Sequence, residues 1–232
     1  MRDYMQLSEK ALKVLKNLAE VNPNILIRDG NILTSLSEAR NILARCEVDI
    51  TFDQEMGIYD LNQFLSALSL VEKPNLKVSP KHVDISADDG KSTIRYFLTK
   101  EIMLTVPPIA LVENAMKADN YGISFDLSES VLNKLKRACS VLGHDYIRIT
   151  PSDLGILLTV SKPEDRTSNS FSIDIDAKSD IEDFDLLLDI NNVKIIPGDY
   201  IVKLSPNLSC KFSSEDGYTY WISLDKKSKY GK

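Results

Sequence analysis

The feature that most constrains this chain is a helix-like segment that occurs twice. Residues 7–21 (LSEKALKVLKNLAEV) and 127–141 (LSESVLNKLKRACSV) align without a gap, at a constant offset of 120 residues. Seven of the fifteen aligned pairs are identical: Leu7/Leu127, Ser8/Ser128, Glu9/Glu129, Leu12/Leu132, Leu15/Leu135, Lys16/Lys136 and Val21/Val141. A repeat of this length predicts two similar domains in tandem, and it has to be recognised before the fold class is assigned.

Both copies have the pattern of an amphipathic helix with one basic side. Apolar residues recur at the helical period, and Ser8 and Ser128 stand at N-cap positions, each followed by a glutamate that favours the positive helix end. The polar arcs carry Lys10, Lys13 and Lys16 in the first copy and Lys134, Lys136 and Arg137 in the second. Surface lysines usually indicate only a solvated face. Here both copies keep the cations although the chain has a net charge of −6, which favours a phosphate-contacting surface.

The segments after each helix predict short strands and a further helix. Ile25–Arg28 and Ile32–Thr34 flank a turn at Asp29-Gly30-Asn31, and Tyr146–Thr150 and Ile156–Val160 flank Pro151–Gly155, so each half is expected to contain a β-hairpin. Second helices are expected at Asp60–Val71 and, shorter, near Ile190–Ile196. The run Leu76–Pro80 is echoed by Val202–Pro206. Each half is therefore predicted as α+β, with two helices packed on antiparallel sheet.

A length of 232 residues suits two domains of ordinary size. We expect an N-terminal domain over residues 1–104 and a C-terminal domain over 123–232. Between them, residues 105–122 lack a clean period and are interpreted as a connector. Its apolar residues indicate either burial against the domains or an open rim for a partner peptide.

Several classes of function find no support in the sequence. The three cysteines are isolated, without metal-ligand or disulfide spacing, which fits a reducing cytoplasm. No signal peptide or membrane span is recognisable. The two histidines have no nucleophile signature nearby, and the acidic run from Asp174 to Asp189 lacks the spacing of a calcium loop, so it is expected to be a solvated surface. The sequence therefore indicates a protein that is not an enzyme and uses no metal or cofactor.

Several stretches resemble the DNA polymerase sliding clamp of T-even-type bacteriophages, in the same order over nearly the whole chain. They are the start from Leu7 to Asn17, Ile58–Leu65 with Leu68–Val71, Pro197–Tyr200, Lys211-Phe212 and Tyr220–Leu224. The resemblance implies two clamp domains per subunit and a ring of three subunits whose helices line a hole for duplex DNA. It also implies an ATP-driven clamp loader, docking of DNA polymerase on one face, a role in late transcription, and expression in the cytoplasm of an infected bacterium.

This implied architecture leads to three sets of site residues. The DNA-facing set is Lys10, Lys13, Lys16, Lys134, Lys136, Arg137 and Lys194. The subunit contact is expected between two edge strands, Ser92–Leu98 and Ser170–Asp176, through Ile94, Tyr96, Leu98, Phe171, Ile173 and Ile175. A partner pocket is expected at Ile109, Leu111, Val112, Pro206 and Tyr220.

Two alternatives belong to other classes of protein. A viral structural or interaction protein with duplicated α+β domains would not associate with DNA. An enzyme using the acidic run and a bound metal would lose activity when Asp174 is changed to Asn, although the run lacks metal-ligand spacing.

Overall fold

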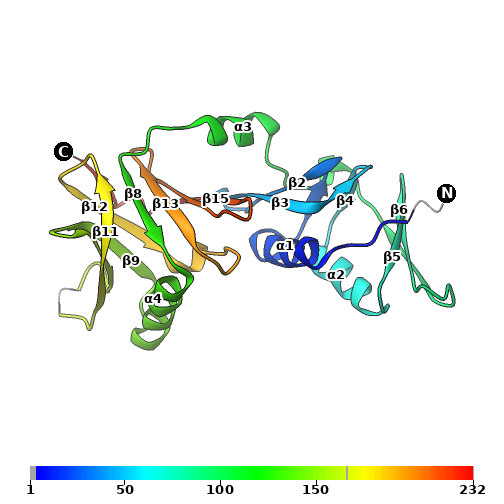
Figure 1. Ribbon diagram of the computed structural model, residues 1–232, viewed down its shortest axis with the longest axis horizontal. Coiled ribbons are helices and arrows are strands. Elements are labelled where there is room, and N and C mark those ends of the chain that lie inside the picture. Colours follow the sequence, from blue (N-terminus) through cyan, green and yellow to red (C-terminus); the bar gives the residue numbers. More distant parts are fainter. Residues whose placement is uncertain (1–3, 166, 232) are drawn as a thin grey trace. The chain divides into compact units, whose positions relative to one another are not determined.

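The computed structural model describes residues 4–165 and 167–231 (Figure 1). The chain divides into two compact units, Met1–Val112 and Glu113–Lys232. The boundary falls inside a helix, α3 (Ile109–Lys117). The sequence pattern predicts no regular element there, so the connector differs from expectation by containing two helical turns.

The first unit combines two α-helices with short antiparallel strands. Its elements are α1 (Glu9–Val21), β1 (Ile25–Ile27), β2 (Gly30–Leu36), β3 (Ile42–Phe52), β4 (Met56–Ile58), α2 (Leu61–Ser69), β5 (Asn75–Ser79), β6 (His82–Ser86), β7 (Thr93–Phe97) and the 3-10 turn η1 (Glu101–Met103). Strand β2 pairs with β3, β1 pairs with β4, and β5, β6 and β7 form a meander. The predicted helix at Asp60–Val71 is confirmed as α2, with Asp60 as its N-cap.

The hairpin expected at Asp29-Gly30-Asn31 is wrong. Strand β1 pairs with β4, with Ile25 opposite Ile58, whereas Gly30 begins β2 and lies opposite Phe52. The turn exists, and Gly30 has the positive φ of 106° that glycine tolerates. All three residues of β1 are buried, so the strand has no polar side to indicate its partner.

Helix α1 begins where the sequence predicts. The Ser8 side chain accepts a hydrogen bond from the Ala11 N–H at 3.0 Å, and its hydroxyl also donates to Asp49. The apolar side of α1 packs on β2, β3 and α2 and buries Val14, Leu15 and Leu18. Because each such side chain contributes about 1.5–3 kcal/mol when buried, this contact accounts for much of the unit's core.

The second unit contains one long helix on a large antiparallel sheet. Its elements are β8 (Ile123–Leu127), α4 (Glu129–Leu142), β9 (Tyr146–Ser152), β10 (Gly155–Val160), β11 (Phe171–Ser179), β12 (Phe184–Asp189), the 3-10 turn η2 (Ile190–Asn192), β13 (Tyr200–Ser205), β14 (Ser209–Ser213), β15 (Tyr218–Ser223) and β16 (Lys229–Tyr230). The strands are ordered β16-β12-β9-β10-β11-β8-β13-β14-β15. The predicted hairpin is confirmed: β9 and β10 pair with Ile147 opposite Val160.

The second helix expected near Ile190–Ile196 is wrong in extent. Only Ile190–Asn192 is helical, as a single 3-10 turn capped by Asp189. Two adjacent asparagines favour local side-chain bonding over helix, and Pro197 cannot continue one. The second unit therefore has α4 where the first has the pair α1 and α2. The class itself, α+β with helices on antiparallel sheet, is confirmed.

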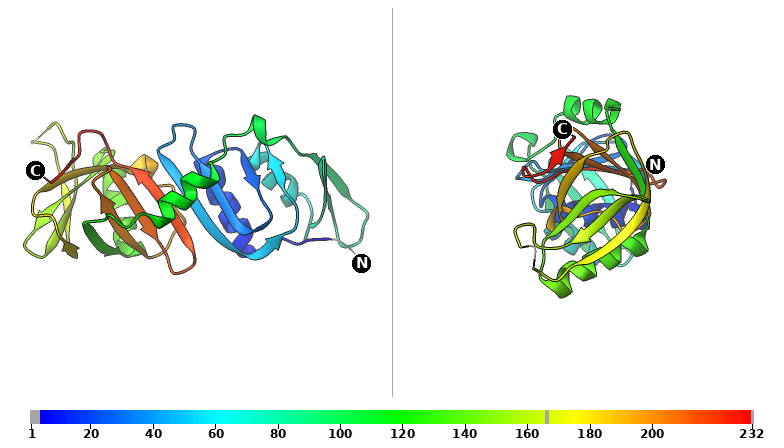
Figure 2. Two further views of the ribbon diagram at one scale, coloured as in Figure 1. Left: turned by 90° about the horizontal axis from the view of Figure 1, so that it is seen from above. Right: turned by 90° about the vertical axis from the view of Figure 1, so that its left-hand side faces the viewer.

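Helix α4 covers one face of the second unit's sheet, as the right-hand view of Figure 2 shows. Ser128 caps it by accepting from the Val131 N–H at 3.3 Å, and Gly143 ends it in the left-handed conformation at φ 67°. Leu132, Leu135 and Cys139 point into the core. No helix in the described part of the chain is long and apolar enough to cross a membrane.

Candidate nucleic-acid interface

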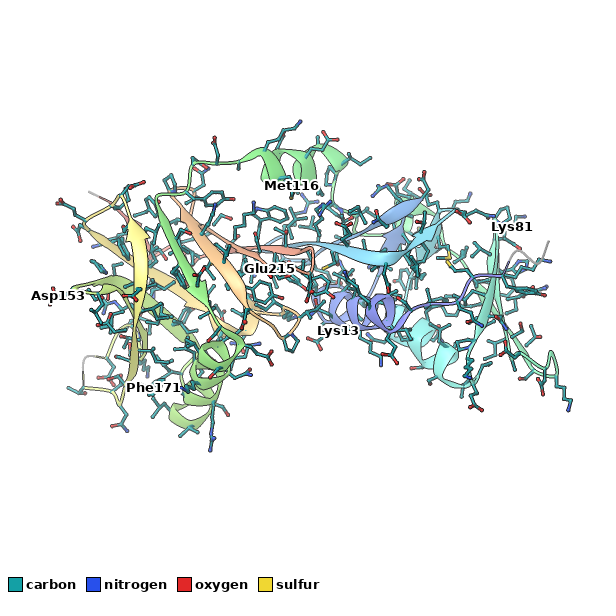
Figure 3. The ribbon with its side chains drawn as sticks, viewed as in Figure 1. Lys13, Lys81, Met116, Asp153, Phe171 and Glu215 are labelled. Atoms are coloured by element: carbon teal, nitrogen blue, oxygen red, sulfur yellow. The ribbon has the colours of Figure 1, made fainter. Side chains whose placement is uncertain are left out.

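The exposed side of α1 forms one line of charges. Lys13 and Lys16 are exposed in its middle, with Glu9 and Glu20 at its ends, and Lys10 is half-buried beside them (Figure 3). Positions spaced by three and four residues are neighbours on a helix surface, so the two lysines form a single basic patch. Each glutamate lies within a turn of a helix end, leaving the centre of the face positive.

Helix α4 also has a basic patch, at a different position around its axis. Lys134 and Arg137 are exposed and three residues apart, whereas Lys136 is half-buried. Lys194, predicted with this group, is half-buried just after η2. Of the seven predicted DNA-facing residues, four are therefore exposed and three are partly covered.

The two copies of the repeat bury different sides. Val14 and Asn17 are buried in α1, whereas Lys134 and Arg137, at the same places in the repeat, are exposed in α4. Val21 is buried too, whereas its counterpart Val141 is 74% exposed. The cause is the missing second helix: α1 packs against α2 as well as its strands, whereas the second unit has only a 3-10 turn for α2's counterpart.

Such patches can attract a phosphate backbone but cannot read base sequence. Lysine and arginine give charge-driven, salt-dependent contacts, and no aromatic side chain lies among them for base stacking. The exposed cations lie near the middle of helices 13 and 14 residues long, or about 20 Å, which is comparable to the width of a duplex.

The acidic run is largely engaged within the protein. Asp185 accepts two hydrogen bonds from Arg148, both at 2.6 Å, and Asp189 caps η2. Asp174 accepts from the Ser152 hydroxyl on the sheet face opposite α4. No group of three metal-ligating side chains is found among the residues that the structure describes. The run therefore acts as a solvated, partly paired surface there.

The cysteines do not form a nucleophilic site. All three are buried, and burial raises the pKa of the Cys139 and Cys210 thiols, so these groups stay protonated near neutral pH. No thiolate is available for covalent chemistry in the folded chain.

The two predicted contact segments both lie at sheet edges. Strand β7 pairs only with β6 among the described strands, and residues 171–176 of β11 pair only with β10, since β8 pairs with residues 177–179. Ile94 and Tyr96 are half-buried on the side facing α2, where Tyr96 stacks edge-on against Phe64. Figure 3 marks Phe171 at the start of β11, opposite the buried Val160.

Each edge strand therefore leaves an incomplete apolar layer. Ile173 and Ile175 lie opposite the fully buried Leu158 and Ile156, yet remain only half-buried themselves. The sequence analysis did not include Phe97, which is 72% exposed on the other side of β7. Strand alternation in TIRYF places Phe97 on the side opposite Tyr96, and this was the available signal.

The predicted partner-pocket residues differ in their surroundings. Ile109 and Leu111 are exposed on α3, which buries none of its residues, and Val112 is half-buried. Pro206 is exposed in the β13–β14 turn. Tyr220 is a correction: its side chain is fully buried, stacks against Tyr200 and accepts from the Ile196 N–H, so it cannot line an open pocket.

Comparison with solved structures identifies the fold. The structure matches a putative DNA polymerase III β subunit from Eubacterium rectale with a TM-score of 0.68 and 15% identity, covering 97% of this chain and 66% of that one. It also matches a PCNA2–PCNA3 complex from Sulfolobus tokodaii with a TM-score of 0.64 and 12% identity, covering 97% and 99%. Two α+β units with these neighbours define a protein of the DNA-clamp fold.

Sequence comparison narrows this class to a family. A family model described as DNA polymerase processivity factor matches residues 8–102. The sliding clamp of Escherichia phage RB69 is 28% identical over 97% of this chain and 98% of its own length. That of Vibrio phage KVP40 is 26% identical over 87% and 91%. The chain belongs to the sliding clamps, the phage DNA polymerase processivity factors, and it is not an enzyme.

Proposed function

We propose that this chain assembles into a closed ring that encircles duplex DNA and tethers the replicative DNA polymerase during processive synthesis. The observation that carries the proposal is the pair of exposed basic patches, Lys13 with Lys16 and Lys134 with Arg137, in a chain of net charge −6. Linkage by a ring needs only weak, sequence-independent phosphate contacts, and these patches can supply them. A negative outer surface would keep the duplex inside the ring.

The assembly that we propose is a homotrimer joined through β7 of one copy and β11 of the next. Two unpaired strand edges can complete each other's hydrogen bonding. The half-buried residues Ile94, Tyr96 and Leu98 would then meet Phe171, Ile173 and Ile175, completing both apolar layers. The number three is taken from the resemblance to phage clamps, because nothing in the strand geometry counts subunits.

The remaining partners follow from the same family resemblance. An ATP-driven loader would open the ring, in the cytoplasm of an infected bacterium. The exposed apolar residues of α3, Ile109 and Leu111, are the proposed contact for a polymerase peptide, with Pro206 beside it. We extend this contact to the late-transcription machinery. A change of Leu111 to Ser is expected to weaken binding of the polymerase tail peptide.

The test is polymerase processivity on primed circular DNA in the presence of loader and ATP. A ring predicts long products on the circular template, lost when the template is linearised so that the ring can slide off. Equal stimulation on linear and circular templates would contradict topological linkage. A structural protein without DNA association, the alternative function, would give no stimulation on either template.

A further inference from the structure

A row of residues on the second unit's sheet places two lysines and a tryptophan side by side. Lys203 on β13 lies directly opposite Lys211 on β14, and Lys211 lies directly opposite Trp221 on β15. The neighbours of Lys203 along the strand, Val202 and Leu204, are buried, so the lysine points to the other face of the sheet. Directly opposite residues have Cβ atoms about 4.5–5.5 Å apart, so the two ammonium groups share one site.

This arrangement is unfavourable for the isolated sheet. Like charges placed directly opposite each other destabilise a strand pair. Neither lysine has a carboxylate within 4.0 Å in the described part of the chain. Burial and the neighbouring Lys203 both lower the pKa of Lys211, which reports the same repulsion. The sheet therefore keeps a cation pair that folding alone does not require.

Aromatic rings surround the inner lysine. The Nζ atom of Lys211 lies 5.6 Å from the ring centre of Trp221 and 5.7 Å from that of Tyr121. Trp221 is only 7% exposed, and its indole N–H makes no hydrogen bond of normal geometry. Its proximity to the Tyr121 hydroxyl offsets only part of the rise in that group's pKa caused by burial. A buried donor without an acceptor is rare in native proteins.

We propose that Lys203, Lys211, Tyr121 and Trp221 form a docking site for an acidic peptide segment of a partner protein. Carboxylates placed between the two ammonium groups would form charge-assisted hydrogen bonds and remove the repulsion. A carboxylate oxygen would also supply the acceptor that the indole N–H lacks. These four residues are called the basic-aromatic site.

The next row of the sheet favours a peptide over a nucleic acid. It holds Ile201, which is 47% exposed, directly opposite Asp126 on β8. An aliphatic side chain beside the cations can contact an apolar residue of a peptide, whereas Asp126 would repel a phosphate backbone. The partner segment is therefore acidic and carries an apolar side chain next to its carboxylates. Since every residue involved lies in the second unit, binding does not require ring assembly or DNA.

The experiment uses Trp221 as a reporter, because it is the only tryptophan in the chain. The full-length protein is titrated with a synthetic peptide in which glutamates flank a central leucine, and Trp221 emission and binding heat are both recorded. We expect saturable binding, about tenfold weaker for Lys203→Thr because one charge-assisted contact is lost. A matched peptide with glutamine in place of glutamate is expected to bind at least as weakly.

The controls separate docking from folding. Lys203→Glu is expected to abolish peptide binding and to raise the midpoint of thermal unfolding by about 2 °C or more, because it replaces repulsion with a cross-strand ion pair. Lys77→Thr, at an exposed lysine on β5, is expected to bind the peptide as the unmodified chain does.

Three results would overturn the proposal. They are the absence of saturable binding by both emission and heat, equal affinity for the Lys203→Thr variant, or displacement of the peptide by a duplex oligonucleotide, which would reassign the site to nucleic acid. None of these bears on processivity, so failure here and failure of the clamp function are distinguishable.

Discussion

Val14 is buried in α1, whereas Lys134, its counterpart in the repeat, is exposed in α4. The substitution is therefore accommodated by a change of neighbours: the side of α1 that packs in the presence of α2 is open in α4. The second copy consequently presents Lys134 and Arg137 to solvent, where the first presents Lys13 and Lys16. A basic patch is preserved although the residues that form it are not the aligned ones.

We predict that Lys134 contributes to DNA contact as much as Lys13 does. Changing either residue to Glu should weaken association with a duplex, and should lower the slope of log affinity against log salt by about 1, as expected for one lost phosphate contact. Fluorescence anisotropy of a labelled duplex over a range of salt concentrations measures both quantities. Lys77→Glu, on β5, is the control with the same charge change. A normal salt slope for Lys134→Glu would remove this residue from the DNA-facing set.

The proposed subunit contact predicts a loss of assembly for Ile173→Asp. Ile173 lies opposite the buried Leu158 but is half-buried at the free edge of β11, so a carboxylate there would be trapped in the contact. Sedimentation at micromolar concentration should show the monomer mass of 26.0 kDa in place of the assembled mass.

The matched control for this prediction is Ser172→Asp. Ser172 is the neighbour of Ile173 on the same edge, but it points to the opposite face and lies against the Thr159 hydroxyl. The same charge is therefore added without entering the apolar layer, and assembly should persist. If both variants stay assembled, the contact does not use this strand.

Local features of the fold were predictable because they depend on residues close in sequence. The serine caps, the two amphipathic helices and the β9–β10 hairpin all follow from short patterns: a hydroxyl before an apolar period, or a tight turn between alternating strands. The basic patches were predictable for the same reason, since the helical period determines which lysines share a side.

Features set by distant partners were not predictable. The ILI run of β1 is buried on both sides, and its pairing with β4 depends on residues about thirty positions away. The exposure of Lys134 depends on a helix that is absent from the second unit, and the burial of Tyr220 on its stacking with Tyr200. The Lys203–Lys211 pair appears only when the register of β13 and β14 is known.

The two serine caps should differ in their contribution to stability. Ser8 accepts from Ala11 at 3.0 Å and also donates to Asp49, whereas Ser128 accepts from Val131 at 3.3 Å. Ser8→Ala should therefore destabilise its helix by about 1–2 kcal/mol, and Ser128→Ala by about 0.5–1 kcal/mol. Amide hydrogen exchange measures each helix separately, which a single unfolding curve of a two-domain chain does not. Equal changes in α1 and α4 would show that the Asp49 contact adds nothing.

Acid should loosen the proposed contact strand β7 before the rest of its sheet. Arg95 on β7 donates two hydrogen bonds to Asp84 on β6, at 2.8 and 3.0 Å, and these, with a smaller effect of His82, hold the pKa of Asp84 below its usual value. Because the folded pKa is below the unfolded value of about 3.9, the stabilisation is complete above that pH and disappears as pH falls through the folded value. Amides of β7 should therefore exchange faster relative to those of β5 below about pH 4. In Asp84→Asn this difference should no longer depend on pH, and equal acceleration of both strands in the unmodified chain would assign the acid response to groups other than Asp84.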